Sequence, residues 1–372
     1  MSKGVLVVGA GISGATIANL IAVRTGTEVT VIDRRQDIGG NCRDYRDENG
    51  IMIHEYGSHI FHTDDQEVWR YLGQFASFNQ YMHHVRAVID GIETEIPFSI
   101  TSLYDVFPES LAHKLEEKLL SNFEYNTRVP VMDLMKKEDE DLKFLASFIY
   151  EKVFLHYTEK QWGLPPDRID GAVTSRVPVV VGKDPRYFRD KYQGIPLEGY
   201  NAMIERMLSV PNITVKLNTD FKDVEDPGQY SHIFYTGSVD EISGSDSGFL
   251  PYRSIRLEFE QHDTEHYLSN AVINYPNNYD FTRIHEFKYY LNDVSDKTVI
   301  AKEYPEEFFP ELNEMFYPIA SEENEKLHTI HSEAVRKKYP NLTVLGRLGD
   351  YKYYDMDKAV RRAMDVFKAE FK

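Results

Sequence analysis

Apolar runs near the start of the chain predict a strand, a helix and a second strand. The first run, Val5-Leu6-Val7-Val8, is continuous and therefore typical of a parallel strand buried on both faces. Small apolar residues at helical spacing follow at positions 15, 18, 21 and 22. The second run, residues 28–33, ends at an acid, Asp33. We therefore predict a β-α-β unit with a glycine-rich turn between its first strand and its helix.

The pattern changes from parallel to antiparallel structure in the middle of the chain. Two short alternating runs between Val85 and Phe98 flank Asp90-Gly91, which is a strong signal for a β-hairpin. Residues 109–120 and 141–157 are predicted to be helical, the second because its apolar residues recur every three or four positions. Beyond Pro178, aromatic-rich segments predict strands at 254–259, 271–275 and 298–302.

Two later segments indicate a return to the first unit. Residues 232–237 and 343–346 are short apolar runs that end in glycine, and the second leads into a last helix from about Met356. We therefore predict an α/β fold with a discontinuous Rossmann-like domain, a helical insert and an antiparallel β-sheet domain. The predicted limits are 1–80, 195–245 and 330–372 for the Rossmann-like domain, 98–170 for the helical domain, and 81–97, 171–194 and 246–329 for the sheet domain.

Charge and cysteine content limit the classes of partner that the protein can bind and indicate its cellular compartment. The 42 basic and 60 acidic residues give a net charge of −18, which disfavours broad affinity for nucleic acid or an anionic membrane. No run approaches the roughly 18 apolar residues of a membrane span, and the start of the chain lacks a secretory signal. The single cysteine, Cys42, permits no internal disulfide and is expected to be a small buried residue. We expect a cytoplasmic protein without a nucleic-acid partner or stable membrane insertion.

The glycine-rich turn matches the dinucleotide-binding fingerprint in its full context. Gly9, Gly11 and Gly14 follow the first strand and open the helix. We expect Gly9 to make the turn, Gly11 to let backbone N–H groups approach a pyrophosphate, and Gly14 to let helix and strand pack closely. Asp33, nineteen residues after Gly14, would accept hydrogen bonds from ribose hydroxyls. The alternative is a glycine turn without a ligand.

A second glycine loop favours FAD over NAD as the dinucleotide. Ile38-Gly39-Gly40-Asn41 follows Asp33 closely and can lie against a longer cofactor. Arg34 and Arg35 can serve its adenine or its phosphates. The alternative is that these glycines make only a turn and the arginines are solvated. We expect the Rossmann-like domain to be an FAD-binding domain.

Longer motifs identify a family resemblance that covers nearly the whole chain. The motifs are HEYGSHIFHT at 54–63, YTEKQWG at 157–163, YQGIP at 192–196, YRS at 252–254, and GRL at 346–348 with YKYYDM at 351–356. In these segments the chain resembles the flavin-dependent UDP-galactopyranose mutases of bacteria. The resemblance implies an isomerase that interconverts UDP-galactopyranose and UDP-galactofuranose for cell-surface polysaccharide biosynthesis, without net redox change.

The resemblance also implies a mechanism and an assembly. In the family, N5 of reduced FAD attacks the anomeric carbon and expels the nucleotide diphosphate, and the flavin N5–sugar adduct then permits ring opening. NADH or NADPH is expected as the external reductant, and a homodimer as the assembly.

By resemblance, two arginines bind the diphosphate of the nucleotide sugar. Arg176 and Arg283 are expected on opposite sides of it, because a guanidinium is always charged and binds oxyanions through two parallel hydrogen bonds. Tyr187 is expected to stack on uracil. His59 and His62 are expected beside the isoalloxazine, where they would hydrogen-bond the flavin or relay a proton. Two histidines without a third ligand at metal-binding spacing do not predict a metal site.

The remaining site residues follow from the same resemblance. The other substrate-binding residues expected are Phe154, Tyr157, Thr158, Trp162, Arg253, Asn270, Asn274, Tyr317, Tyr353 and Asp355. The cofactor-binding residues expected are Gly9, Ala10, Gly11, Ser13, Gly14, Asp33, Arg34, Gly39, Gly40, Asn41, His59, Ile60, Gly237, Arg347, Asp355 and Met356.

Several residues depart from the family pattern and leave the sugar open. Val180 stands where the family has a second loop arginine, and Glu198 stands where it has a glycine. Ser58 replaces an expected alanine, Phe287 an expected histidine and Phe316 an expected tyrosine. A mutase for a TDP-deoxyhexose or for UDP-N-acetylgalactosamine is therefore an alternative. An FAD-dependent amine oxidase and a non-catalytic nucleotide-sugar sensor are the alternatives from other classes.

Overall fold

The computed structural model describes residues 4–164, 178–310 and 312–371 of the chain. A sheet of five strands forms the first domain, and all of its neighbouring strands are parallel. In order across the sheet, the strands are β11 (Ile213–Lys216), β2 (Val29–Ile32), β1 (Val5–Val8), β12 (His232–Tyr235) and β18 (Leu342–Val344).

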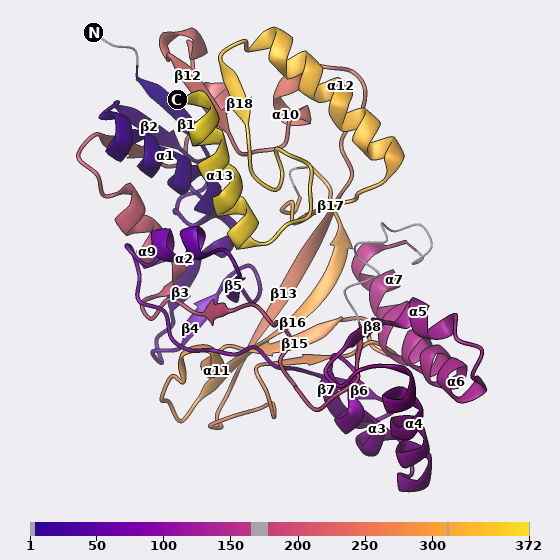
Figure 1. Ribbon diagram of the computed structural model, residues 1–372. Coiled ribbons are helices and arrows are strands. Elements are labelled where there is room, and N and C mark those ends of the chain that lie inside the picture. The colour runs from indigo at the N-terminus through magenta and orange to yellow at the C-terminus, as the bar shows by residue number, and fades with distance from the viewer. Residues whose placement is uncertain (1–3, 165–177, 311, 372) are drawn as a thin grey trace.

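The predicted β-α-β unit occupies the centre of this sheet. Helix α1 (Ile12–Thr25) connects β1 to β2 and ends at Gly26, whose positive φ of 69° suits glycine. Helix α13 (Met356–Glu370), the last helix, packs against α1, so the two ends of the chain lie in one domain (Figure 1). The segments at 232–237 and 343–346 return to the sheet as β12 and β18. The predicted Rossmann-like α/β fold is therefore confirmed.

A second, mostly antiparallel sheet of seven strands forms the lower part of the molecule in Figure 1. The hairpin predicted around Asp90-Gly91 is present, and both of its turn residues have positive φ values, of 50° and 85°. The pair β14–β6 is the parallel one. In order, the strands are β17 (Tyr317–Pro318), β13 (Tyr252–His262), β16 (Thr298–Glu307), β15 (Arg283–Glu286), β14 (Val272–Asn274), β6 (Val85–Ile89) and β7 (Ile92–Ile96).

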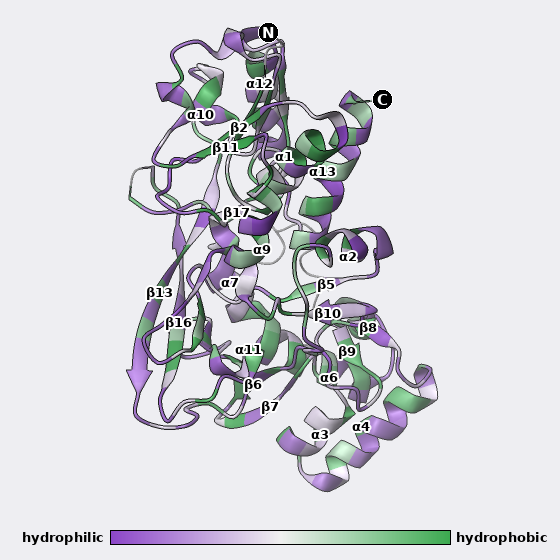
Figure 2. Ribbon diagram, turned by 90° about the vertical axis from the view of Figure 1, so that its left-hand side faces the viewer, coloured by the Kyte–Doolittle hydropathy of each residue, from purple (hydrophilic) through white to green (hydrophobic). Residues whose placement is uncertain are grey.

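A group of helices is inserted between β7 and the segment of Tyr187. Figure 2 shows hydrophobic and hydrophilic residues alternating along α4, as expected for a helix that buries one face. The insert comprises α3 (Ile100–Val106), α4 (Glu109–Asn122), α5 (Val131–Met135), α6 (Glu140–Ile149) and α7 (His156–Trp162), with short strands β8 (Arg128–Pro130) and β9 (Pro178–Val180).

The segment predicted to be helical over 141–157 is helical throughout, but it is not one regular α-helix. Asp139 caps the start of α6 by accepting from two backbone N–H groups, which explains the acidic start. A π-helical turn, Tyr150–Leu155, then separates α6 from α7. A π-turn adds one residue to a helical turn and is frequent at functional sites. It changes the direction in which the side chains of α7 point.

Further elements connect the strands of these sheets along the chain. Helix α12 begins at residue 322, so the domain limit predicted at 330 falls inside a helix. None of the helices in the described ranges combines the length and apolar character that crossing a membrane requires. The connecting elements are β3 (Asp44–Arg46), β4 (Met52–His54), β5 (Phe61–Thr63), α2 (Gln66–Leu72), β10 (Tyr192–Gly194), α9 (Gly199–Leu208), α10 (Asp240–Ser243), α11 (Lys288–Leu291) and α12 (Glu322–Lys338).

Candidate functional site

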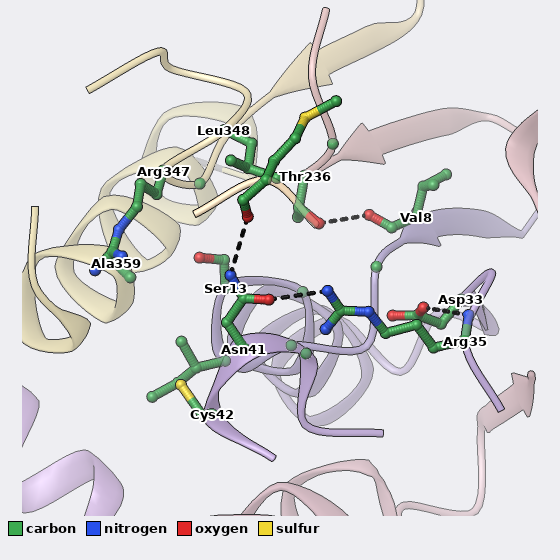
Figure 3. Close-up of a pocket in the computed structure, with 18 of the residues that line it drawn as sticks. Val8, Ser13, Asp33, Arg35, Asn41, Cys42, Thr236, Arg347, Leu348 and Ala359 are labelled. Carbon is green, nitrogen blue, oxygen red and sulfur yellow. Dashed lines mark hydrogen bonds between the residues drawn. The ribbon is translucent and has the colours of Figure 1, made fainter. Parts of the chain in front are cut away.

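A pocket opens at the carboxyl ends of β1 and β12, where an open parallel sheet forms its binding crevice. Figure 3 shows Ser13, Asp33, Asn41 and Arg347 around it, from segments far apart in the sequence. The predicted cofactor-binding residues that line it are Gly9, Gly11, Ser13, Gly14, Asp33, Arg34, Gly39, Gly40, Asn41, His59, Gly237, Arg347, Asp355 and Met356.

Two predicted cofactor-binding residues do not line this pocket. Ala10 is fully buried, and its backbone N–H donates to Asp33 Oδ2 at 2.7 Å. Ile60 packs against the hydrophobic core instead. Ala10 therefore acts on the pocket through Asp33, whose other oxygen accepts from the backbone N–H of Arg35 at 2.9 Å. These two bonds fix the carboxylate and leave it lone pairs for further donors.

The three fingerprint glycines are required for different reasons. Gly9 has a φ of 106°, and a Cβ there would lie 2.0 Å from Thr236 Oγ1. A Cβ on Gly14 would lie 1.8 Å from the carbonyl oxygen of Gly9, so strand and helix pack closely, as predicted. A Cβ on Gly11 would meet only ordinary contacts, the nearest being Gly40 Cα at 3.6 Å. The protein itself therefore tolerates a side chain at Gly11, and the missing Cβ leaves room for a ligand.

The two arginines after Asp33 are held by acids at the pocket's rim. Arg35 pairs with Glu314 at 2.7 Å and donates to Asn41 Oδ1 at 2.9 Å, as Figure 3 shows for Asn41. Arg34 pairs with Glu241 at 3.0 Å. Both guanidinium groups thus have protein partners, and these partners orient them beside the pocket.

His59 presents a neutral imidazole to the pocket. Burial and the charge of Arg347 lower the pKa of His59 to about 4. Its Nδ1 donates to the carbonyl oxygen of Gly57 at 2.7 Å. Because a neutral imidazole has one N–H, Nε2 of His59 is an acceptor.

A second cluster lies on the antiparallel sheet and is built around a half-buried arginine. Arg283 on β15 lies directly opposite Glu303 on β16, and its Nε donates to Glu303 Oε2 at 2.8 Å. Burial alone would raise the pKa of Glu303, but Arg283 and His285 outweigh it and lower the pKa to about 2. Burial would likewise lower the pKa of Arg283, but Glu303 raises it well above its ordinary value. The pair is therefore fully charged.

Asn274 is the neighbour of Arg283 on the other side. It lies opposite Arg283 on β14, and its buried Oδ1 has no hydrogen-bond partner among the described residues. A buried polar atom of this kind indicates a ligand or water. Asn274 was predicted to bind substrate, whereas the predicted contact Asn270 donates to the carbonyls of His84 and Val272 and thus holds the backbone.

An aromatic cluster connects the pocket to Arg283. The Arg347 guanidinium, which lines the pocket, lies 5.6 Å from the ring centroid of Tyr317 and 5.5 Å from that of Tyr353. Trp162 of α7 contacts both rings, at centroid distances of 6.1 and 5.8 Å. Tyr317 is also close enough to Arg283 to raise its pKa. The pocket and the arginine cluster thus lie close to each other, with Tyr317 near both Arg347 and Arg283.

Helix α7 forms a wall of this site and is fixed at two points. Lys160 Nζ donates to the carbonyl oxygens of Tyr275, Tyr279 and Phe281, at 2.6, 3.0 and 2.9 Å. Arg253 Nε donates to the carbonyl of Gln161 at 2.9 Å, and its Nη2 to that of Lys160 at 3.1 Å. These bonds show that Arg253 holds the end of α7; its place near the flavin or sugar stays a prediction. The predicted substrate residues on or before α7, all at least half-buried, are Phe154, Tyr157, Thr158 and Trp162.

Two further predicted residues lie on the far side of the site. The amide of Tyr187 donates to the carbonyl of His83 at 2.8 Å, and its ring meets that of His83 edge to face. His62 stacks on Phe188 at 3.6 Å, and its Nδ1 lies 3.2 Å from Asp190 Oδ2. Nε2 of His62 lies 3.9 Å from Asp355, which lines the pocket, so His62 borders the pocket through that residue. Arg176 lies outside the described residues.

The residues that depart from the family pattern lie in varied places. Phe287 and Val180 are fully buried, and Phe316 packs between Tyr56 and Tyr317. Glu198 pairs with Arg206 at the surface. Ser58 contacts the arginine cluster.

Sequence reasoning missed Glu303, His285 and Tyr290 of this cluster. A signal was present, because Glu303 directly follows the strand predicted at 298–302, and a carboxylate buried there needs a cationic partner. The identity of that partner depends on strand pairing, which the sequence pattern did not provide.

Comparison with known proteins decides the family. The family profile of UDP-galactopyranose mutase matches residues 152–353, and that of an NAD(P)-binding Rossmann-like domain matches residues 7–75. A probable UDP-galactopyranose mutase of Klebsiella pneumoniae is 35% identical, over 98% of this chain and 93% of that protein. The chain belongs to the UDP-galactopyranose mutase family. The predicted family and isomerase class are confirmed, and the comparisons support a flavin cofactor.

A second relative is named for a different sugar, and a solved structure can be compared with the fold of this chain. A dTDP-fucopyranose mutase of Escherichia coli is 32% identical, over 97% of this chain and 96% of that protein. The crystal structure of a reduced UDP-galactopyranose mutase has a TM-score of 0.72 at 16% identity, and covers 100% of this chain and 97% of that chain. The structural likeness confirms the fold.

Proposed function

We propose that this protein is a mutase that binds FAD and interconverts UDP-galactopyranose and UDP-galactofuranose. The proximity of the dinucleotide pocket to the charged Arg283–Glu303 pair carries this proposal. Arg347 lines the pocket and lies against Tyr317 and Tyr353, so a ligand in the pocket would be close to a ligand held by Arg283. A site for small cationic amines would not place an arginine there, because like charges repel.

The pocket fits FAD by the chemistry of its lining. Gly11 leaves space that no side chain of the protein requires, and the N-terminus of α1 favours a pyrophosphate. Asp33 would accept the ribose hydroxyls, and the Arg347 side would face the flavin. When bound and reduced, FAD would supply a nucleophile to the sugar without net redox change. NADH or NADPH is proposed as the reductant.

The protein's own groups would bind and orient the nucleotide sugar. Arg283 would bind the diphosphate, and Glu303 would hold the guanidinium in its orientation. The unpartnered Oδ1 of Asn274 would accept from a hydroxyl or an amide of the substrate. The neutral His59 would offer an acceptor at Nε2 beside the flavin. Trp162, together with the tyrosines around Arg347, would exclude water.

A dTDP-linked deoxy sugar is the second candidate substrate. It is favoured by the dTDP-fucopyranose mutase, which matches this chain over nearly its whole length. A competition experiment on the reduced protein separates the two candidates. We expect UDP to inhibit more strongly than dTDP, and UDP-galactopyranose to be converted faster than dTDP-fucopyranose; the reverse order in both would assign the deoxy sugar.

The fingerprint glycines provide a prediction about cofactor binding. We expect Gly11→Ala to fold but to bind FAD at least tenfold more weakly, because the new methyl group meets no clash in the protein and enters the ligand's space. Gly14→Ala should instead yield little folded protein, since its Cβ would overlap the Gly9 carbonyl. FAD titration of the apoprotein by flavin fluorescence, with circular dichroism as the fold control, checks both. If Gly11→Ala binds FAD with normal affinity, the proposal that the pyrophosphate binds at this loop is wrong.

Assembly and compartment are further parts of the proposal. We propose a homodimer that acts in the cytoplasm, and light scattering of the purified holoprotein measures the first of these directly.

A further inference from the structure

A serine in the loop that borders the pocket contacts two buried side chains of the sheet domain. Ser58 precedes His59, which lines the pocket. Its Oγ lies 2.5 Å from Nδ1 of His285, and it also hydrogen-bonds the hydroxyl of Tyr290. His285 and Tyr290 are both fully buried. A single hydroxyl group therefore joins the pocket's loop to β15 and α11.

On its other side, His285 is joined to the arginine cluster. Its Nε2 lies 3.1 Å from Glu303 Oε2, the same oxygen that accepts from Arg283 Nε. Glu303 is ionised because Arg283 and His285 overcome the effect of burial on its pKa. Burial lowers the pKa of His285, with the charge of Arg283 acting in the same direction. A carboxylate thus faces a neutral imidazole.

One arrangement of protons satisfies all of these groups. A carboxylate only accepts hydrogen bonds, so Nε2 of His285 must carry the single ring hydrogen. Nδ1 is then an acceptor and requires a donor, and the hydroxyl of Ser58 is in contact with it. The Ser58 oxygen in turn accepts from the hydroxyl of Tyr290. The hydrogen bonds run in one direction, from Tyr290 through Ser58 and His285 to Glu303.

We propose that Ser58 is a positioning residue that fixes the tautomer of His285 and, through Glu303, the orientation of Arg283. Without the hydroxyl, Nδ1 would be a buried acceptor without a donor, which is costly. The imidazole would then rotate or take up a second proton, and either change alters its bond to the oxygen that holds Arg283. The consequence for substrate binding rests on the proposed role of Arg283 at the diphosphate.

The first test reads the tautomer in the unaltered holoprotein. Nitrogen NMR of histidine-labelled protein, with His285 assigned by comparison with His285→Gln, distinguishes the two ring nitrogens. We expect a protonated Nε2 and an unprotonated Nδ1 at neutral pH. The opposite tautomer, or an imidazolium, would overturn the proposal whatever the substrate is.

The second test compares two serine–histidine pairs in which the histidine is buried. Ser243 Oγ lies 2.8 Å from Nδ1 of His331, which contacts the Gly248 carbonyl through Nε2 at 2.9 Å. Ser243→Ala thus removes the same kind of bond away from Arg283. We expect Ser58→Ala to weaken UDP binding roughly fivefold to tenfold, the size of one hydrogen bond, and Ser243→Ala to leave it unchanged. Ser58→Thr, which keeps a hydroxyl, should restore most of the affinity.

The NMR test and the binding test together distinguish a failure of this proposal from a failure of the proposed function. Equal effects of Ser58→Ala and Ser243→Ala on UDP affinity would overturn the positioning role. If the unaltered protein shows the expected tautomer but binds no UDP, the hydrogen-bond arrangement stands and the proposed substrate fails.

Discussion

Arg283→Ala should lower kcat by roughly 10²- to 10³-fold, a loss of about 3–4 kcal/mol of transition-state stabilisation. The expected cause is that the departing diphosphate gains charge that a preorganised guanidinium no longer neutralises. Because Arg283 does not line the dinucleotide pocket, FAD content should remain that of the unaltered protein. Chromatographic rates of the reduced variant and its flavin absorbance measure the two quantities.

Two further variants make this prediction specific. Arg283→Lys keeps the charge but loses the fork-shaped donor geometry, and should retain part of the activity. Arg256 on β13 pairs with Glu306 and Glu258 near the surface, so Arg256→Ala is a matched control that should be nearly normal. Near-normal turnover of Arg283→Ala would exclude Arg283 from the site.

Glu303→Gln should lower both stability and activity. Removing one partner of a buried ion pair leaves an uncompensated charge, which costs about 3–5 kcal/mol. Glu303 is buried but the Arg283 side chain is 25% exposed, so water partly stabilises the unpaired guanidinium and we expect a loss at the lower end of this range. Denaturant unfolding at fixed FAD concentration measures the loss. Glu306→Gln, on the same strand but partly exposed, is the control and should cost under about 1 kcal/mol.

The stability lost in Glu303→Gln should depend on pH in a definite direction. The pKa of Glu303 falls from 4.5 to about 2 on folding, so its stabilising contribution is fully present above the unfolded pKa. As pH falls from about 4.5 towards 2, that contribution is lost and the two proteins should converge in free energy of unfolding. A difference that stays constant over this range would contradict an ionised Glu303.

Local signals in the sequence predicted the parts of the fold whose causes are local. The apolar run at 5–8, the fingerprint glycines and Asp33 all depend on neighbours within one β-α-β unit, and the structure places them together. The hairpin at Asp90-Gly91 likewise needs only two residues with positive φ. Such features are determined over a few residues, so a pattern reveals them.

Features that depend on distant partners could not be predicted in this way. The sequence around Arg253 does not reveal that its side chain donates to the carbonyls that end α7, because those carbonyls lie about ninety residues away in the chain. The apolar residues at 142, 145, 146, 149 and 153 recur every three or four positions up to and into the π-turn before α7, so the pattern does not reveal it. The partner of Arg283 is twenty residues away and is set by the register of β15 and β16.

The family resemblance supplied candidate residues for the site, and the structure brings some of them close together but gives others different contacts. Asn274 lies opposite Arg283, and Tyr317 lies near both Arg283 and Arg347. Asn270 instead holds backbone groups, which is visible only from its hydrogen bonds. A role can thus be assigned to a residue in a family motif only when the contacts of that residue are known.

The most direct test of the proposed mutase is a redox-controlled conversion of UDP-galactofuranose by the purified holoprotein. One anaerobic sample is reduced with dithionite, a second is kept oxidised, and both are followed by chromatography until the composition is constant. We predict that the reduced sample forms UDP-galactopyranose and that the oxidised sample forms almost none. No conversion by the reduced protein of UDP- or dTDP-linked furanoses, together with oxygen uptake by the oxidised protein on an amine, would contradict the account.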